Sequence, residues 1–472
     1  MTAFKKIEEE DLRFFTQLLG QIHTHTSPEK LAICAKDETE DFMYMPEVVL
    51  CPATAFEVSQ IMRYCSTHLI PVTPRGGGTG LSGGALPVHG GVVLSMERFN
   101  KILDIDTVNL QATVEPGVVT EVFQKAVMEK GLFYPPDPAS KGSCFLGGNL
   151  AECSGGPKAV KYGVTRDYVL NIEMVTAQGD IFWTGANVLK NSTGYNLTQL
   201  MIGSEGTLGI ITKIVFKLRP LPTKSLVLLV PFYSSEMACR AISSIYLAGI
   251  VPSGMEFMEH DAINITSAYL EEKLKSKSVV PHQEGIEAHL IIELDGNKDE
   301  ELLQNAELIH EVLADYEIGE ILLAQDHTHK EELWKLRRQI SPALNAFSHT
   351  KSEDLVVPRS QLPNLILKIK AIAKLYGFRA VCYGHAGDGN LHVNILKESL
   401  SDAYWQHEVP KAMREMFAAC IALGGTLSGE HGIGWAKREF MPMAMPEIKL
   451  TIMRGIKQVF DPKGILNPSK IF

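Results

Sequence analysis

The chain lacks the features that mark several large classes of protein. No apolar run in its 472 residues approaches the roughly 18 residues that a transmembrane helix needs. The segment Lys5 to Glu10 near its start resembles neither a signal peptide nor a transit peptide. Lys and Arg number 45 against 55 Asp and Glu, and this net charge of −10 argues against nucleic acid or an anionic membrane as the main partner. We therefore expect a cytoplasmic protein without a transmembrane segment.

Cysteine shows no arrangement typical of a disulfide framework or an iron–sulfur cluster. The eight cysteines are scattered along the chain, and no two of them form a Cys-x-x-Cys motif. We therefore expect reduced thiols, most of them buried. Internal repeats, low-complexity tracts and long linkers are missing too, and the length suits about three domains.

Two histidines flank a glycine-rich turn in the segment 384–394, Gly-His-Ala-Gly-Asp-Gly-Asn-Leu-His-Val-Asn. Its flanks read as strands and its glycines as a hairpin loop. Because strand side chains alternate between faces, His392 and Asn394 share one side, and His385 at the loop mouth can turn toward it. Two imidazoles placed in this way suit a metal such as Zn²⁺. A lone histidine pair is more often hydrogen-bonded structure than a pair of metal ligands, so the hairpin by itself leaves both readings open.

A second cluster places Glu430 and His431 next to each other within 424–434, a segment that holds five glycines. So much lost chain entropy is typical of backbone pressed against a ligand. Glu430 could complete a His/His/Glu metal shell with an open position, which leaves His431 as a general base near neutral pH. The weaker alternative is a surface loop with incidental charge.

The two ends of the chain carry helical patterns, and a β/α passage follows the first of them. Apolar residues at helical spacing predict an N-terminal helix that stops at Gly20, namely Leu12, Phe15, Leu18 and Leu19. We then predict a strand at 47–51, a helix opened by a capping box of Thr54 and Glu57, and a strand at 69–73. A final helix is predicted to bury one apolar face, formed by Ile448, Ile452, Ile456 and Val459.

A glycine-rich loop at 74–84, Pro-Arg-Gly-Gly-Gly-Thr-Gly-Leu-Ser-Gly-Gly, can cradle a pyrophosphate through backbone N–H groups and hydroxyls. Part of it also satisfies the G-x-G-x-x-G pattern of a Rossmann fold. That fold needs a helix directly after the loop, whereas Pro87, Gly90 and Gly91 precede the next predicted strand, 92–95. We therefore predict a nucleotide-type cofactor, with NAD binding only as a minor alternative.

Five motifs in order along the chain resemble the vanillyl-alcohol-oxidase/PCMH flavoprotein superfamily. They are the loop 74–84, Gly147 to Gly156, Ile202 to Gly209, the hairpin with His385, and Gly464 to Pro468. The likeness is closest to its FAD-linked D-2-hydroxyacid dehydrogenases, the group of D-lactate dehydrogenase, the glycolate oxidase catalytic subunit and D-2-hydroxyglutarate dehydrogenase.

The resemblance implies an α+β fold with four parts. These are an N-terminal helical arm (1–44), a PCMH-type FAD-binding domain (45–223), a cap domain for the substrate with an antiparallel sheet (224–423), and a C-terminal segment (424–472). The FAD-binding domain should consist of two subdomains that divide at about Asn109. The C-terminal segment should return to the FAD domain and complete the active site.

The resemblance also implies which residues bind FAD. The expected contacts are Arg75, Gly76, Gly77, Gly78, Thr79, Gly80, Leu81, Ser82, Pro138, Ser140, Gly148, Ser154, Glu205, Gly209, Ile211 and Asn467. Small residues fit this role because they let the backbone approach the cofactor closely. Relatives with covalent flavin have a histidine in the first glycine loop, where this chain has Gly78, so we expect non-covalent FAD.

The remaining site residues follow from the same resemblance. It places a divalent metal, Zn or Mn, on His385, His392 and Glu430, a substrate-contacting amide on Asn394, and the catalytic base on His431. The arginine that binds the substrate carboxylate falls in a Leu-Trp-x-x-Arg motif as Arg337, with Ser341 one helical turn onward. Its neighbour Arg338 is expected in a solvated ion pair. The role of Lys351, near a family lysine, is left open.

The implied activity is oxidation of a small D-2-hydroxy acid, D-lactate first, to the 2-oxo acid, with hydride transfer to flavin N5 and metal-assisted substrate binding. The alternatives within the family are glycolate oxidase and D-2-hydroxyglutarate dehydrogenase. Two alternatives from other classes are a metal-dependent hydrolase and a non-catalytic flavin-binding subunit. Re-oxidation needs a separate acceptor, whether quinone, electron-transfer flavoprotein, cytochrome or iron–sulfur subunit, and through this acceptor the protein could lie at the periphery of a membrane. A homodimer is compatible with the resemblance.

Overall fold

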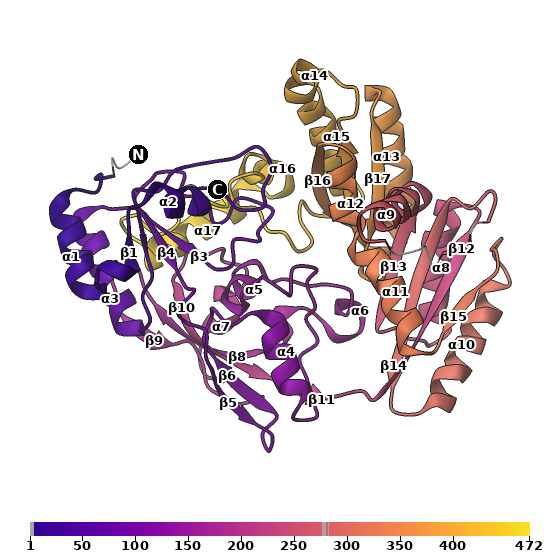
Figure 1. The fold of residues 1–472 in the computed structure, drawn as a ribbon, viewed down its shortest axis with the longest axis horizontal. Coiled ribbons are helices and arrows are strands. Elements are labelled where there is room, and N and C mark those ends of the chain that lie inside the picture. Colours follow the sequence, from indigo (N-terminus) through magenta and orange to yellow (C-terminus); the bar gives the residue numbers. More distant parts are fainter. Residues whose placement is uncertain (1–3, 276–279, 282) are drawn as a thin grey trace. The chain divides into compact units, whose positions relative to one another are not determined.

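The structure of the protein is a computed structural model that describes residues 4–275, 280–281 and 283–472 (Figure 1). The chain folds into two compact units. The first unit comprises Met1–Gly155, Val164–Leu221 and Glu430–Phe472, and the second comprises Gly156–Gly163 and Pro222–Gly429. Helices and mostly antiparallel sheets occur in both, which is the α+β class expected from the sequence.

The first unit opens with a small mixed sheet in the order β1-β2-β4-β3. Its strands are β1 (Thr24–His25), β2 (Val48–Leu50), β3 (Val72–Arg75) and β4 (Val92–Ser95). Strand β4 lies parallel to β2 and to β3, and no helix lies between β3 and β4, a stretch that the structure describes throughout. The exclusion of a Rossmann helix after the glycine loop is therefore confirmed.

The second sheet of this unit is antiparallel, with the order β5-β6-β10-β8-β9. Its strands are β5 (Ile102–Asp106), β6 (Gln111–Val114), β8 (Val169–Val175), β9 (Ile181–Trp183) and β10 (Ile210–Lys217). Because β5 pairs with β6, the predicted subdomain border near Asn109 is wrong and belongs before Ile102. A further short pair joins β7 (Leu132–Phe133) to β11 (Arg219–Pro220).

The first unit also contains several helices. They are α1 (Glu9–Leu19), α2 (Pro28–Cys34), α3 (Ala55–His68), α4 (Thr120–Met128), α5 (Leu146–Glu152), α7 (Leu197–Met201), α16 (Met441–Ala444) and α17 (Glu447–Phe460). The predicted N-terminal helix is α1, which buries Phe15 and Leu19 and ends at Gly20, whereas the first three residues of the predicted arm lie outside the described residues. The predicted capping box of Thr54 and Glu57 opens α3.

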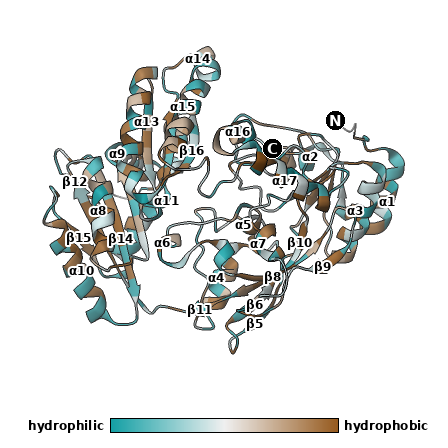
Figure 2. Ribbon diagram, turned by 180° about the vertical axis from the view of Figure 1, so that it is seen from behind, coloured by the Kyte–Doolittle hydropathy of each residue, from teal (hydrophilic) through white to brown (hydrophobic). Residues whose placement is uncertain are grey.

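The predicted orientation of the last helix, α17, is wrong. Ile448, Ile452 and Val459 are 67%, 56% and 77% exposed, and the residue that the helix buries fully is Leu450. By their spacing, Ile448, Ile452 and Val459 lie on one face of the helix, and this face is exposed (Figure 2 colours the ribbon by hydropathy). The opposite side, with Leu450, is the buried one, and there the ammonium of Lys457 donates to the carbonyl oxygens of Thr207 and Leu466.

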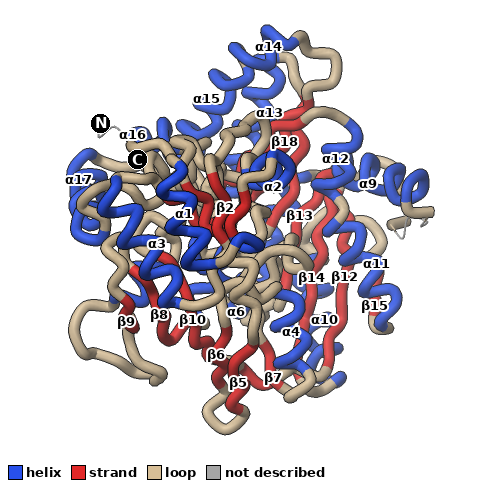
Figure 3. The backbone as a smooth tube through the Cα atoms, turned by 60° about the vertical axis from the view of Figure 1, so that its left-hand side comes forward, coloured by secondary structure: helices blue, strands red, loops and turns tan. Residues whose placement is uncertain are grey.

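The second unit is built on a seven-stranded antiparallel sheet in the order β15-β12-β14-β13-β17-β18-β16 (Figure 3). Its strands are β12 (Lys224–Phe232), β13 (Gly254–Glu259), β14 (Ala288–Gly296), β15 (Leu322–Ala324), β16 (Thr350–Val356), β17 (Arg379–Gly384) and β18 (Asn390–Leu396). Its helices are α6 (Ala159–Tyr162), α8 (Ser235–Leu247), α9 (His260–Lys273), α10 (Asp299–Leu313), α11 (His327–Arg338), α12 (Ile340–Phe347), α13 (Leu362–Tyr376), α14 (Asp402–His407) and α15 (Val409–Ala422).

Two expectations about the whole chain can be checked at this level. All eight cysteines are free and buried, as the sequence predicts. Within the part of the chain that the structure describes, no helix combines the length and the apolarity that a membrane span requires.

Candidate functional site

The first unit contains a pocket whose walls are the glycine-rich loops. Its lining includes Arg75, Gly76, Gly77, Gly78, Thr79, Gly80, Leu81, Pro138, Ser140, Gly148, Ser154, Glu205, Gly209 and Ile211, together with Glu430 and His431. The loops pack too closely for larger residues. A Cβ on Gly77 would lie 2.5 Å from the carbonyl oxygen of Ser143, and Gly78 adopts a φ of +72°. Because glycine has no side chain, the polar backbone itself forms this part of the pocket wall.

Two of the expected cofactor residues do not line this pocket. Ser82 is fully buried, and its carbonyl oxygen accepts hydrogen bonds from the N–H groups of Trp435 and Ala436. Asn467 donates to the carbonyl oxygens of Gly84 and Glu205 at 3.0 and 2.7 Å. Both residues therefore join the C-terminal segment to the walls of the pocket and hold those walls in place.

Arg75 lies in the pocket lining, but its guanidinium is engaged by helix α2. It donates to the carbonyl oxygens of Lys36 at 2.8 Å and Ile33 at 3.4 Å, near the C-terminal end of that helix. A Cβ on Gly78 would lie 2.1 Å from Nη2 of the same guanidinium. The arginine thus braces the loop, and Gly78 gives it the space to do so.

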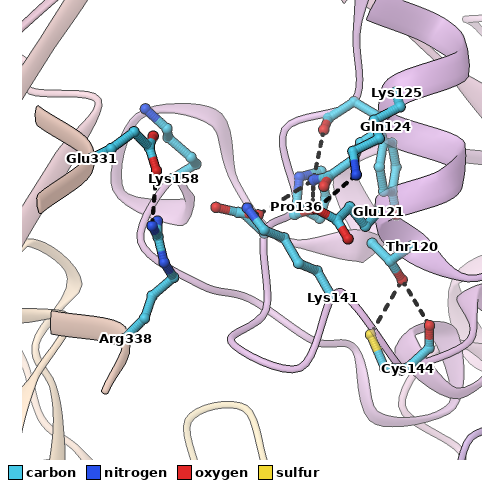
Figure 4. Close-up of polar contacts among 12 residues, drawn as sticks. Thr120, Glu121, Gln124, Lys125, Pro136, Lys141, Cys144, Lys158, Glu331 and Arg338 are labelled. Carbon is cyan, nitrogen blue, oxygen red and sulfur yellow. Dashed lines mark hydrogen bonds and ion pairs between the residues drawn. The ribbon is translucent and has the colours of Figure 1, made fainter. Parts of the chain in front are cut away.

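Helix α5 forms another wall of the pocket and is fixed by a buried polar contact. Thr120 bonds to both the carbonyl oxygen and the Sγ of Cys144, which lines the pocket (Figure 4). Asn149 in turn donates to the hydroxyl of Thr120 at 2.6 Å. These bonds hold α5 and the loop before it as one rigid element.

Glu205 positions the segment that carries Glu430 and His431. Its carboxylate accepts hydrogen bonds from the backbone N–H groups of Ile433 at 2.8 Å and Gly434 at 2.6 Å. Burial raises the pKa of Glu205 to about 7, although these two N–H groups act in the opposite direction. The chain directly after His431 is thereby held on the pocket wall.

The second unit contains the predicted histidine hairpin, formed by β17 and β18. The loop takes the short turn Ala386–Asp388 and then the left-handed Gly389, with a φ of +84°. The ring centroids of His385 and His392 lie 5.2 Å apart. The hairpin thus brings the two imidazoles together, as expected from the alternation of strand side chains.

A buried carboxylate that sequence reasoning missed, Glu256 on β13, joins two of the predicted residues. It accepts a hydrogen bond from Nε of Arg337 at 2.7 Å and contacts Nδ1 of His385 at 2.8 Å. Burial by itself raises the pKa of Glu256, but the charges of His385 and Arg337 outweigh it, so that the pKa lies below its ordinary value. A sequence signal did exist, since two glutamates, Glu256 and Glu259, lie among the apolar residues of this buried strand.

Arg337, Ser341 and Asn394 meet around one aromatic ring. The guanidinium of Arg337 lies 4.9 Å from the ring centre of Tyr383. Burial raises the pKa of Tyr383, whereas Arg337 and hydrogen bonding with Asn394 and Ser341 partly lower it. The predicted carboxylate arginine, the hydroxyl and the amide therefore form a single polar group in the second unit.

Asp354 on β16 supports the other histidine and the chain that leads to Glu430. It pairs with His392 across the sheet, with 3.8 Å between Oδ1 and Nδ1. Its second oxygen accepts from the Ser428 hydroxyl and the Gly429 N–H, each at 2.9 Å. Gly429 directly precedes Glu430 in sequence. A single buried carboxylate therefore fixes β18 and the end of this glycine-rich segment.

The other two cations of the sequence analysis, Arg338 and Lys351, contact different residues. Arg338 donates to Glu331 at 3.0 Å in an exposed ion pair (Figure 4), as expected. Lys351 lies opposite Ile395 on β18, and its ammonium lies 5.3 Å from the ring centre of Trp405. Because side chains alternate along a strand, Ser352 shares the face of Asn394 and Lys351 occupies the other face.

Comparison with protein families gives two matches in order along the chain. Residues 46–185 match the FAD binding domain, and residues 221–471 match the C-terminal domain of FAD linked oxidases.

Among curated proteins, the chain is 39% identical to glycolate oxidase subunit GlcD of Bacillus subtilis, over 92% of this chain and 91% of that protein. It is 37% identical to D-lactate dehydrogenase of Anaerostipes hadrus, over 90% and 89% of the two chains. It is 32% identical to D-2-hydroxyglutarate dehydrogenase of Stutzerimonas stutzeri, over 95% of both.

Solved structures with the same fold include p-cresol methylhydroxylase, with a TM-score of 0.81 at 18% identity over 100% of this chain and 98% of that one. Another is 4-ethylphenol oxidase from Gulosibacter chungangensis, with a TM-score of 0.78 at 18% identity and the same coverage. At this identity the likeness concerns the fold alone, and it is the fold expected from the sequence motifs.

Proposed function

Because the chain belongs to the FAD-linked oxidases that include the 2-hydroxyacid dehydrogenases, we propose that it oxidises a small D-2-hydroxy acid, with D-lactate as the first choice. FAD, when bound, supplies the acceptor for the hydride that leaves the substrate's Cα. The product would be the 2-oxo acid. Glycolate oxidation and D-2-hydroxyglutarate oxidation are the alternatives within the family.

The observation that carries this proposal is the buried Arg337. Its guanidinium is held by Glu256, with 2.6 Å between Nη2 and the carboxylate, and it lies over the ring of Tyr383. A guanidinium fixed in this way can bind a substrate carboxylate with little loss of side-chain freedom. Ser341 and Asn394, which contact the same tyrosine, can hydrogen-bond the substrate beside it.

D-Lactate is preferred over D-2-hydroxyglutarate because of the side chains on the face of Asn394. The longer substrate brings a second carboxylate, which calls for a second cation. On β16 this face carries the hydroxyl of Ser352, which donates to Asn394, while Lys351 points to the opposite face. We therefore expect the site to bind a short substrate with one carboxylate more tightly than one with two.

The pocket of the first unit fits FAD, since its glycine loops offer backbone N–H groups and small residues. Arg75 to Leu81, Pro138, Ser140, Gly148, Ser154, Glu205, Gly209 and Ile211 would hold it there. Ser82 and Asn467 would support the walls. The cofactor should be non-covalent, because Gly78 stands where covalent relatives have histidine. Yellow colour that stays with an acid-precipitated pellet would contradict this.

A divalent metal, Zn or Mn, is the second cofactor of the proposal, with His385, His392 and Glu430 as its ligands. Neutral imidazoles and a carboxylate are a usual donor set for such ions. The contact of Glu256 with Nδ1 of His385 is the carboxylate support that metal-binding histidines commonly have. In this arrangement His431 stays available to take the proton of the substrate hydroxyl.

Variants of adjacent residues test the division of roles between metal ligand and base. His431→Ala should retain FAD and metal, yet lose on the order of 10²–10⁴ in the rate of flavin reduction. His392→Ala should lose metal and activity together, as read by elemental analysis and stopped-flow absorbance. If His431→Ala emptied the metal site while Glu430→Ala kept it, the two neighbours would exchange roles.

The substrate is tested by anaerobic addition of D-lactate, glycolate, D-2-hydroxyglutarate and the L isomers to the purified protein. Loss of the flavin absorbance should be fastest with D-lactate, and faster bleaching by D-2-hydroxyglutarate would overturn that choice. A colourless protein would favour a metal-dependent hydrolase built on His385, His392 and Glu430. A yellow protein that no 2-hydroxy acid bleaches would favour a non-catalytic flavin-binding subunit.

In this proposal the electron acceptor is a separate partner. It belongs to one of four classes, namely quinone, electron-transfer flavoprotein, cytochrome or iron–sulfur subunit. A cytoplasmic location, peripheral to the membrane through that acceptor, belongs to the same proposal. The relatives give it some support, because one of them, GlcD of Escherichia coli, is named as a subunit of glycolate oxidase.

A further inference from the structure

Glu152, the last residue of α5, presents a carboxyl group in the lining of the first unit's pocket. Its Oε2 is buried and has no hydrogen-bond partner among the residues that the structure describes. Two glycines make room for this group. A Cβ on Gly432 would lie 2.1 Å from Oε2, and a Cβ on Gly84 would lie 2.8 Å from Oε1. The carboxyl group is therefore tightly enclosed at the pocket wall.

The charged groups around Glu152 are mostly of the same sign. Glu205 and Asp37 act on it as carboxylates, and Lys470 is the cation that opposes them. Lys437 acts on Glu205 in the same sense as Lys470. Burial is the largest cause that opposes ionisation of Glu152, and the two neighbouring carboxylates add to it.

The hydrogen-bond donors near this cluster bond to atoms other than the Oε2 of Glu152. Glu205 accepts two backbone N–H groups, and Oδ1 of Asp37 accepts the N–H of Thr39 at 3.0 Å. Lys470 donates to the carbonyl oxygen of Leu86. Burial, followed by the charges of Glu205 and Asp37, raises the pKa of Glu152 well above its ordinary value. The structure thus gives Glu152 a reason to hold a proton and, within the described chain, no acceptor at Oε2 to receive it.

We propose that Glu152 binds FAD as a neutral carboxylic acid and donates a hydrogen bond from its carboxyl group to an acceptor atom of the cofactor. This inference rests on the FAD binding of the proposed function and adds a protonation requirement to it. FAD brings a negatively charged pyrophosphate into the pocket, so an ionised carboxylate in the lining would oppose binding. When Glu152 is ionised beforehand, it takes up one proton from solvent as FAD binds.

The expected pH dependence follows from this requirement. Below the pKa of Glu152 in the FAD-free protein, the affinity for FAD is independent of this group. Above that pKa, the protonated fraction falls tenfold per pH unit, and the affinity falls with it. Glu205, with a pKa of about 7, and Lys470, with a pKa lowered to about 8 mainly by burial, titrate nearby, so the contribution of Glu152 must be isolated by substitution.

The substitution Glu152→Gln isolates the contribution of Glu152 to the pH dependence, because the amide keeps a hydrogen-bond donor and cannot ionise. FAD-free protein and its variant are titrated with FAD between pH 6 and pH 9.5, with quenching of FAD fluorescence as the readout. At pH 6 the two dissociation constants should agree within about threefold. Above the pKa of Glu152 the parent protein should bind progressively more weakly than the variant, by tenfold for each further pH unit.

Proton uptake provides a second test without any substitution. Calorimetric titration with FAD in two buffers of different ionisation enthalpy counts the protons bound. Uptake should approach one proton per FAD at high pH and fall toward zero at pH 6, and Glu152→Gln should remove this difference. Parallel pH profiles for the two proteins, or loss of FAD by Glu152→Gln at pH 6 with an unchanged circular dichroism spectrum, would overturn the inference. Failure of both proteins to bind FAD at every pH would overturn the proposed function instead.

Discussion

The two units build their sites from different materials. In the first unit the pocket wall is mostly backbone, and its shape depends on glycines such as Gly77 and Gly78, which have no side chain. In the second unit the polar group consists of buried charged side chains, with Glu256 holding both Arg337 and His385. The first site should therefore fail when a carbon atom is added, and the second when a charge is removed.

The largest effect is expected at Gly77. Gly77→Ala would bring a Cβ to 2.5 Å from the Ser143 carbonyl oxygen, which is rigid backbone. The loop must shift, and the purified protein should contain little or no FAD by its absorbance spectrum. Gly142→Ala is the matched control, because its Cβ would lie 3.7 Å from a flexible Glu121 carboxylate. Equal FAD content in both variants would show that the loop does not depend on a bare backbone.

The next effect is expected at Glu256. Glu256→Ala leaves the buried guanidinium of Arg337 without its partner, which should cost about 3–5 kcal/mol of stability. Hydrogen exchange should show faster opening of β13 and β17, with the first unit unchanged. Glu331→Ala removes one partner of the exposed Arg338 pair and should cost about 1 kcal/mol at most. Similar exchange in the two variants would contradict the role given to burial.

A smaller effect is expected from His289, a buried histidine on β14. Burial lowers its pKa from 6.5 to about 4. The folded unit therefore holds it neutral, and the unfolded chain binds its proton first as the pH falls. Its contribution to stability is complete above pH 6.5 and is lost as the pH falls toward 4, by about 3 kcal/mol in all.

His289→Leu should flatten this part of the pH dependence, measured as the difference in urea unfolding of the second unit between pH 7 and pH 4.5. The parent protein should lose more stability over this interval than the variant. The same loss in both proteins would mean that other groups govern the acid sensitivity.

Local patterns predicted much of the fold. The capping box of α3, the stop of α1 at Gly20 and the hairpin of β17 and β18 each depend on residues close together in sequence, and all three are confirmed. The glycine loop without a following helix is confirmed for the same reason.

Contacts between distant residues were not predictable in the same way. Glu256 meets Arg337 across 81 positions, and Glu152 lies beside Gly432 only after the chain folds back. Helix α17 shows the same limit, because on its buried side Lys457 bonds to the carbonyl of Thr207, 250 positions away. Periodicity identified the helix, but not which of its sides is buried.

The most direct test of the account compares the wild-type protein with Arg337→Met by anaerobic stopped-flow mixing with D-lactate. We expect both proteins to carry the same flavin absorbance, since the substitution lies in the second unit and the pocket lining in the first. Wild type should be reduced at a rate that saturates with D-lactate. The variant should need a far higher concentration and react at least about tenfold more slowly, because the substrate carboxylate loses its fixed cation. Equal rates and equal saturation in the two proteins would contradict the assignment of Arg337, and with it the proposed oxidation of a 2-hydroxy acid at this site.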